Sequence, residues 1–292
     1  MKKHVYGSAV LLVAGVLGNA WIARAQITQP FDLTVPNGGS ALINGSYFFP
    51  RYNTSVVSGS GTYGSYLKVD GGQSGVAQGI SNGHNQTYDN QSGVSLNNSL
   101  LRAPVNLPSS YWSFSLDINE SAGGGAQFLS LDDLKVFVTS TPVTSAQATT
   151  LQQLQQFAGN PVWDMDDGTW SGGVQTVTYD RTILLDYLLV SGGSGNDDML
   201  WLLPQNLIPS GPNVFVTIYT RFGTIFSLSG ANFSGRDYTE DAGGEEWRTV
   251  SGLTINIPPP VPEAGTFIAG IAVALGVAGQ GWRQRRGQVK AA

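Results

Sequence analysis

Residues 111–118 read Tyr111-Trp112-Ser113-Phe114-Ser115-Leu116-Asp117-Ile118. The even-numbered side chains are all large and apolar, whereas the odd-numbered ones after Tyr111 are serine or aspartate. Consecutive side chains of an extended chain point to opposite faces, so one face of this stretch is apolar and the other polar. This pattern predicts a half-buried strand of an antiparallel sheet, with the polar face in water.

Similar β-rich runs recur on both sides of this strand, separated by loops rich in Gly, Ser and Asn. The other candidate strands are 41–49, 63–69, 127–139, 174–179, 182–190, 199–203, 213–220, 224–228 and 247–257. One helix, 145–157, has apolar residues at helical spacing, although its Gln-rich remainder is equally compatible with a loop. The Gly-, Ser- and Asn-rich stretch 71–98 predicts a long surface loop. The sequence therefore predicts an all-β fold, an antiparallel two-sheet sandwich of jelly-roll-like type.

The composition excludes several kinds of chemistry. The 292 residues contain no Cys and two His, which excludes disulfides, thiolate metal sites, a Cys nucleophile and a His-based metal site. Within the body the one His is His84, in the predicted loop. A Ser-His-Asp triad is therefore not expected.

The N-terminus predicts a secretory signal peptide over residues 1–25. Lys2 and Lys3 precede an uncharged, largely apolar run, and Ala23 and Ala25 are the small residues that signal peptidase reads. The apolar run is short for a membrane span, which needs about 20 residues. We therefore expect export through the Sec machinery and cleavage before Gln26.

The C-terminus predicts membrane insertion. Residues 258–263 form a Pro-rich linker, residues 264–282 are uncharged, and residues 283–292 are basic, with Arg283, Arg285 and Arg286 directly after the uncharged run. Nineteen helical residues would extend about 28 Å, close to the thickness of the hydrocarbon core. The arginines would stay cytoplasmic by the positive-inside rule and stop the helix, so the body at 26–257 lies outside.

This tail resembles the PEP-CTERM sorting signal of Gram-negative bacteria, in which a Pro-Glu-Pro motif precedes a transmembrane helix and an Arg-rich end. Val261, Pro262 and Glu263 supply the motif region, and Ala264 replaces the family's second proline. The resemblance implies recognition by an exosortase. It also implies a membrane-anchored intermediate in the inner membrane, followed by the cell surface or an extracellular matrix linked to exopolysaccharide or biofilm. Blocks of the body such as 129–137 and 192–199 are similar to the extracellular domain of many such proteins.

The exported body is acidic. Between residues 26 and 262 the chain has 8 Lys and Arg against 19 Asp and Glu, which gives 8 − 19 = −11. Such a charge argues against nucleic acid as a partner. It also repels anionic polymers unless divalent cations bridge them.

Clustered acids suggest calcium, which takes six to eight oxygen ligands. Asp164, Asp166 and Asp167 are the candidate Ca²⁺ ligands, although their spacing departs from an EF-hand loop because Gly168 follows where a third oxygen ligand belongs. The alternative is that these and the other paired acids are ordinary turn residues and solvated strand faces.

A glycan-acting enzyme, a carboxylate-based glycoside hydrolase or lyase, is the alternative to a non-catalytic structural or binding module. Glu245 and Glu246 beside Trp247 are candidate acids, but neighbours on one strand point to opposite faces and cannot serve one site. Trp170, flanked by small residues, is the candidate platform for a sugar ring, whereas most other tryptophans of the body are expected in the core. We expect no catalysis.

Overall fold

The structure is a computed structural model that describes residues 30–35, 39–50, 67–69, 75–81, 101–102, 109–171, 174–189, 195–209, 213–225 and 234–250. The predicted signal peptide with Ala23 and Ala25, the motif at Val261, Pro262 and Glu263, the membrane helix and the three arginines lie outside these residues, as does His84. Within the described part of the chain, no helix is long and apolar enough to cross a membrane.

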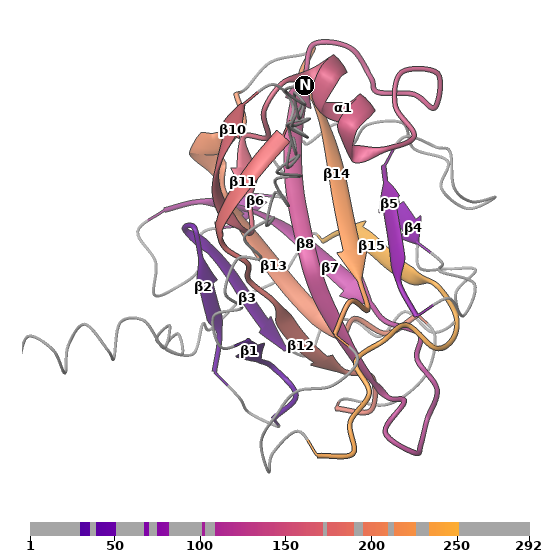
Figure 1. The fold of residues 1–292 in the computed structure, drawn as a ribbon. Helices are drawn as coiled ribbons and strands as arrows, with labels where there is room; N and C mark the ends of the chain where they lie inside the picture. The colour runs from indigo at the N-terminus through magenta and orange to yellow at the C-terminus, as the bar shows by residue number, and fades with distance from the viewer. Residues whose placement is uncertain are drawn as a thin grey trace, which may run out of the picture.

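Two sheets account for most of the described chain (Figure 1). The first has the order β1 (Phe31–Asp32), β12 (Ile183–Asp186), β8 (Phe128–Thr139), β14 (Phe215–Phe222) and β5 (Ala77–Ile80), with β9 (Trp163–Asp164) also paired to β8. The second has the order β2 (Ala41–Ile43), β3 (Ser46–Pro50), β13 (Met199–Pro204), β7 (Tyr111–Asp117), β15 (Glu245–Thr249) and β4 (Leu67–Val69), with β6 (Leu101–Arg102) on β7.

The remaining elements are a hairpin of β10 (Asp167–Ser171) and β11 (Val174–Tyr179), the helix α1 (Leu151–Ala158) and the short 3₁₀ helix η3 (Gln205–Leu207). Strand pairing is antiparallel except between β1 and β12. The predicted all-β, two-sheet sandwich is thus confirmed.

The core between the sheets is centred on tryptophan. Trp201 on β13 is fully buried, and its ring stacks on Phe114 of β7 at 4.8 Å and on Phe48 of β3 at 6.0 Å between centroids. Trp112, Trp163 and Trp247 are buried as well, which confirms the prediction that most tryptophans of the body lie in the core. Rings of this size supply much of the apolar area that drives folding.

The prediction that β7 has a solvated polar face is wrong, because every residue of the strand is buried. The strand lies between β13 and β15, and the hydroxyls on its second face have partners. Ser113 donates to the Val250 carbonyl at 2.8 Å, and Ser115 donates to Asp197 at 2.8 Å. Small hydroxyl side chains can be buried when their hydrogen bonds are made within the protein.

The predicted strand 41–49 is instead the hairpin β2–β3. Asn44 and Gly45 form its turn with φ of 48° and 80°. Two consecutive residues with positive φ are typical of the type I′ turn, for which Asn-Gly is the preferred sequence. The turn reverses the chain so that Ile43 pairs with Ser46.

Four other elements differ from the prediction. The helix begins at Leu151, after Thr150 caps it by accepting a bond from Gln153 N, and its Phe157 is 41% exposed. Part of the predicted loop 71–98 is β5, whose apolar ends are buried against β14. Residues 224–225 follow β14 without strand pairing, and the last described strand starts at residue 245 rather than 247.

Candidate functional site

A bulge in β8 creates the most highly charged part of the first sheet. On β14, Phe222 pairs with Leu131 whereas the preceding Arg221 pairs with Asp133, so Asp132 is an extra residue in β8. Asp132 accepts hydrogen bonds from Ser130 Oγ at 2.9 Å and Thr224 N at 2.7 Å. After an extra residue the alternation of faces shifts by one. Leu134 therefore returns to the core, and Asp133 and Lys135 lie on the outer face of the sheet.

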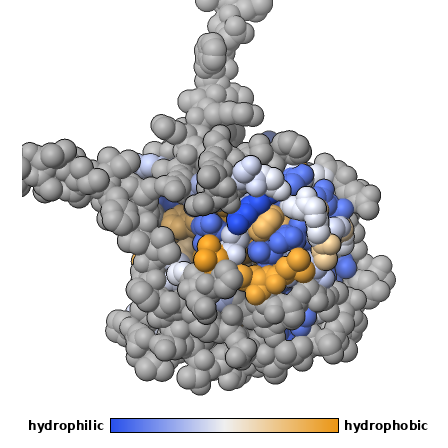
Figure 2. Space-filling model, turned by 90° about the horizontal axis from the view of Figure 1, so that it is seen from below, coloured by the Kyte–Doolittle hydropathy of each residue, from blue (hydrophilic) through white to orange (hydrophobic). Residues whose placement is uncertain are grey.

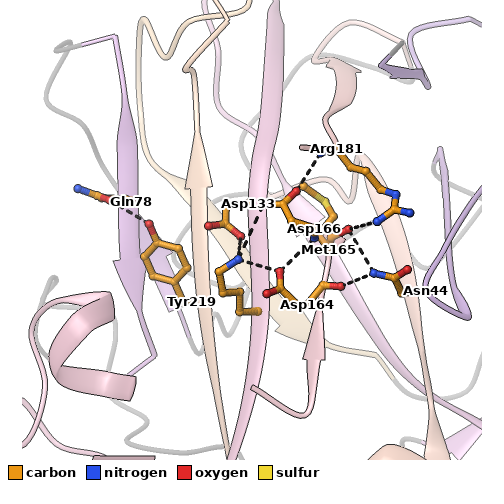
Figure 3. Close-up of polar contacts among 9 residues, drawn as sticks. Asn44, Gln78, Asp133, Asp164, Met165, Asp166, Arg181 and Tyr219 are labelled. Atoms are coloured by element: carbon orange, nitrogen blue, oxygen red, sulfur yellow. Dashed lines mark hydrogen bonds and ion pairs between the residues drawn. The ribbon is translucent and has the colours of Figure 1, made fainter. Parts of the chain in front are cut away.

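Lys135 is the centre of a buried ionic cluster (Figure 3). Its Nζ atom lies 2.6 Å from Asp133 Oδ1, 2.7 Å from Asp164 Oδ1 and 3.8 Å from Asp166 Oδ2. The lysine side chain is 1% exposed. We refer to Asp133, Lys135, Asp164 and Asp166 as the aspartate–lysine cluster.

Strand β9 and the turn after it deliver two of the aspartates. Asp164 pairs with Lys135 in register, and its carbonyl accepts a bond from Asn44 Nδ2 at 2.7 Å. Asp166 N donates to Asp164 Oδ1 at 3.0 Å, and Asp166 Oδ1 accepts from Arg181 N at 2.9 Å. The Asn44 turn thus fixes β9 against the sheet in addition to reversing the chain.

Burial and charge act against each other in this cluster. Loss of solvation, reinforced by the charge of Asp133, raises the pKa of Asp166 to about 8, so this carboxyl holds a proton at neutral pH. Burial opposes the charge of Lys135, but the surrounding aspartates outweigh it and raise the pKa of the ammonium. Arg221, which pairs with Asp133 across the strands, adds a second positive charge. The cluster is therefore close to internal neutrality.

An apolar cover closes the outer face next to the cluster. Phe137 follows Lys135 on the same face of β8, and Tyr219 on β14 packs with it and with Leu154 of α1. The Tyr219 hydroxyl donates to Gln78 Oε1 at 3.0 Å, and burial raises the pKa of this phenol to about 12. The charges therefore lie in surroundings with little water, where ion pairs are strong only if they are complete.

The structure brings together two of the three predicted calcium ligands. Oxygens of Asp164, Asp166 and Asp133 all lie within 4.8 Å of one another. The side chain of Asp167 is outside the described part of the molecule. The Lys135 ammonium lies among the three carboxylates, so a calcium ion there would have to displace it. Calcium at this place stays a prediction.

The sequence analysis did not identify Lys135 as a site residue, and it left open whether the paired acids are exposed to solvent. The pattern that could have predicted an ion pair at Lys135 is Asp133-x-Lys135 within a largely apolar strand, because residues two apart in a strand share a face. The alternative of solvated acids is wrong for most of these pairs: Asp132, Asp133, Asp166, Asp197, Asp198, Glu240, Glu245 and Glu246 are all at most 5% exposed.

The other predicted site residues do not join this cluster. Trp170 pairs through its backbone with Gln175 in the β10–β11 hairpin, and its side chain is outside the description. Glu245 and Glu246 have different partners, as expected for neighbours on one strand: Asn119 N donates to Glu245 at 2.9 Å, and Lys68 lies 3.2 Å from Glu246. A sugar platform at Trp170 stays a prediction.

Comparison of the chain with protein-family models, with curated proteins and with solved structures found no match in any of the three.

Proposed function

We propose that this chain is an exported β-sandwich protein of the cell envelope or extracellular matrix, which binds or supports other matrix components and is sorted by its C-terminal tail. The observation that carries the proposal is the order in which the predicted segments follow one another along the chain. A leader with Ala23 and Ala25 precedes the sandwich, and seven residues separate Val250, the last residue that the structure describes, from the Pro-rich linker. The membrane helix and the arginine stop follow directly.

The aspartate–lysine cluster supports a structural rather than a catalytic use of the acids in the first sheet. Lys135 and Asp166 are 1% and 5% exposed, Asp166 holds a proton, and the charge of Lys135 is compensated by Asp133 and Asp164. A general acid or base has to reach its substrate directly or through one water. The same contacts instead join β8, β9 and the segment before β12 into one unit.

The partner that fits the proposal is an extracellular polysaccharide. The exported body has a net charge of −11, so an acidic polymer would need divalent cations as bridges, whereas a neutral one would need stacking surfaces such as Trp170. A Trp170→Ala variant that loses retention on immobilised exopolysaccharide would support the second route.

The sorting part is tested by expressing the full chain in a host with and without its exosortase. We expect Glu263→Gln to keep its membrane topology but to mature slowly, and joint replacement of Arg283, Arg285 and Arg286 by Gln to disturb topology itself. Lys290→Gln, further from the predicted helix, is the matched control. Identical maturation and localisation with and without the exosortase would contradict the proposal.

The non-catalytic part is tested with a panel of bacterial polysaccharides. We expect no hydrolysis or elimination by the purified chain. Reproducible turnover that disappears when one carboxylate is changed to its amide would instead support the glycan-acting enzyme.

A further inference from the structure

The pairing of two strands holds Lys135 against one carboxyl group. Lys135 on β8 and Asp164 on β9 are partners across the strands, and Lys135 Nζ lies 2.7 Å from Asp164 Oδ1 (Figure 3). Strand β9 is fixed on its other side by Asn44 Nδ2, which donates to the Asp164 carbonyl at 2.7 Å. Backbone structure therefore keeps the amine nitrogen and the carboxyl group in contact.

This contact lies in surroundings with little water. The Lys135 side chain is 1% exposed, and the apolar cover with Phe137 and Tyr219 lies next to it. By contrast, hydrophilic and hydrophobic residues lie side by side on the described surface at the end of the sandwich away from α1 (Figure 2), where water screens charges. Loss of solvation disfavours charged groups, so it brings the neutral amine and the neutral acid closer in free energy to the ion pair. In line with this, burial is the main cause that raises the pKa of the Asp164 carboxyl.

Asp164 is the carboxyl best placed for attack by the lysine nitrogen. Its Oδ1 accepts the Asp166 N–H at 3.0 Å, and such a donor stabilises the negative charge that develops on the oxygen when a nitrogen attacks the carbon. Asp164 is also the most exposed of the three aspartates around Nζ, at 13%, which leaves a route for a released water molecule. Asp133 lies at 2.6 Å from Nζ on the same strand and is the alternative partner that an experiment has to separate.

We propose that Lys135 Nζ and the Asp164 carboxyl condense to an amide, a covalent cross-link between β8 and β9. The ion pair described above is the state from which the bond forms. The ammonium gives up a proton, and the amine attacks Asp164 Cγ to form the C–N bond. The C–O bond to Oδ2 then breaks, and this oxygen leaves as water with the two protons that Nζ has given up. Asp133 and Asp166, at 2.6 Å and 3.8 Å from Nζ, carry these protons. Atoms and charges balance without an oxidant or a co-reactant.

The fold supplies what this condensation lacks in free solution. Well-oriented groups within one molecule react as if at effective concentrations of about 10⁵–10⁸ M. The product also replaces two buried charges by one neutral amide, so the cost of burying both ions disappears. The link closes a loop over residues 136–163, which includes α1, and so restricts the unfolded chain in a protein that has no Cys for disulfides. It also withdraws Asp164 from any calcium site.

Tryptic digestion of the denatured full chain, followed by mass spectrometry, tests the cross-link. Lys135 is the one basic residue between Arg102 and Arg181, so an unlinked chain gives the peptides 103–135 and 136–181. An amide at Nζ blocks cleavage after Lys135. We expect one peptide, 103–181, whose mass is lower than that of its sequence by one water molecule. Further cleavage with chymotrypsin after Phe137 and Phe157 should leave the Lys135 peptide joined to the Asp164 peptide.

Two controls belong to the same experiment. Lys68, which is 17% exposed and lies 3.2 Å from Glu246, should be cleaved normally by trypsin in the wild type. Lys135→Arg keeps the positive charge, but its guanidinium stays protonated and does not attack a carboxyl, so this variant should have the full mass. Near-ultraviolet circular dichroism checks that the variant is folded, and the wild-type digest decides the question if it is not.

Three results would overturn the proposal. The first is a wild-type chain of full mass that trypsin cleaves after Lys135. The second is a loss of water with cleavage after Lys135 intact, because Asp167-Gly168 can lose water by ring closure without the lysine. The third is a Lys135 peptide that lacks one water but separates from the Asp164 peptide after chymotrypsin, which would place the bond at Asp133.

Discussion

Asp133 and Lys135 lie two residues apart on β8, on the same outer face, with Asp133 Oδ1 2.6 Å from Lys135 Nζ. One strand thus contributes both members of a buried ion pair, and β9 adds Asp164 at 2.7 Å from the same nitrogen. The arrangement places opposite charges side by side without relying on a flexible loop. It stabilises the fold only as long as the pair is complete, because an isolated buried charge is costly.

Replacement of Lys135 by Met should therefore destabilise the protein strongly. The apolar stem is kept, but the charged carboxylates of Asp133 and Asp164 lose their ammonium partner, and removing one partner of a buried pair costs about 3–5 kcal/mol. We expect a value near the lower end, because Arg221 remains beside Asp133. Chemical denaturation of both chains at pH 7 measures the difference in the free energy of unfolding.

Lys68→Met is the control for this prediction, since Lys68 is 17% exposed and pairs with Glu246. It should cost clearly less than Lys135→Met. Equal losses in the two variants, or a Lys135→Met variant as stable as the wild type, would show that the cluster does not hold β9 in the way described.

Stability should fall as the pH rises from about 5 to about 8, because of Asp166. Its folded-state pKa of about 8 is above the unfolded value of about 3.9, so between these values the folded chain binds the extra proton. Stability then declines with pH by up to about 1.4 kcal/mol per pH unit for each such group. Asp166→Asn, whose amide resembles the protonated acid, should show a shallower decline when melting is followed in EDTA across this range.

The comparison for the pH prediction is Asp32→Asn, which removes a carboxylate that bonds to Thr34 within its own turn. A wild-type chain that becomes more stable between pH 5 and pH 8 would contradict a protonated Asp166.

The alternation in 111–118 was sufficient to predict a sandwich strand, because the apolar face of β7 does pack on the core through Phe114 and Leu116. The opposite face could not be predicted, since Ser115 looks the same in sequence whether water or Arg248 lies beside it. The burial of Ser115 depends on Arg248 and Asp197, which are far away in sequence. They meet Ser115 only after β15 and β13 have paired with β7.

The candidate site was predictable only in part for the same reason. Asp164 and Asp166 are close in sequence, so their clustering is local and visible. Asp133 and Lys135 join them through the pairing of β8 with β9, and the bulge at Asp132 decides which face they occupy. Without that extra residue the alternation would place Asp133 and Lys135 on the core face.

Gly223→Ala should be strongly destabilising. Gly223 has φ of +78°, which costs a non-glycine residue about 1–2 kcal/mol, and its Cβ would also overlap the Gly75 oxygen at 2.3 Å. The hydrogen bond that Glu240 N donates to the Gly75 carbonyl at 3.1 Å would then open. Thermal melting should show a larger loss than for Gly124→Ala, where φ is +66° and nothing lies within 4 Å of the new Cβ. Similar losses in both variants would mean that backbone conformation alone sets the cost.

The last prediction separates specific calcium binding from simple screening of the acidic body. A cation that binds only the folded chain stabilises it by RT ln(1 + [L]/Kd), about 2.7 kcal/mol at a hundredfold excess over Kd, which is a rise of a few degrees in Tm for a chain of this size. Screening would act equally for sodium at matched ionic strength. We expect Ca²⁺ to raise the Tm more than Mg²⁺ or NaCl does, relative to EDTA. The Asp164→Asn variant then tests the predicted ligands Asp164, Asp166 and Asp167. If it keeps the whole rise, those aspartates do not bind the ion. Equal curves in Ca²⁺ and NaCl for the wild type would contradict specific calcium binding at these aspartates.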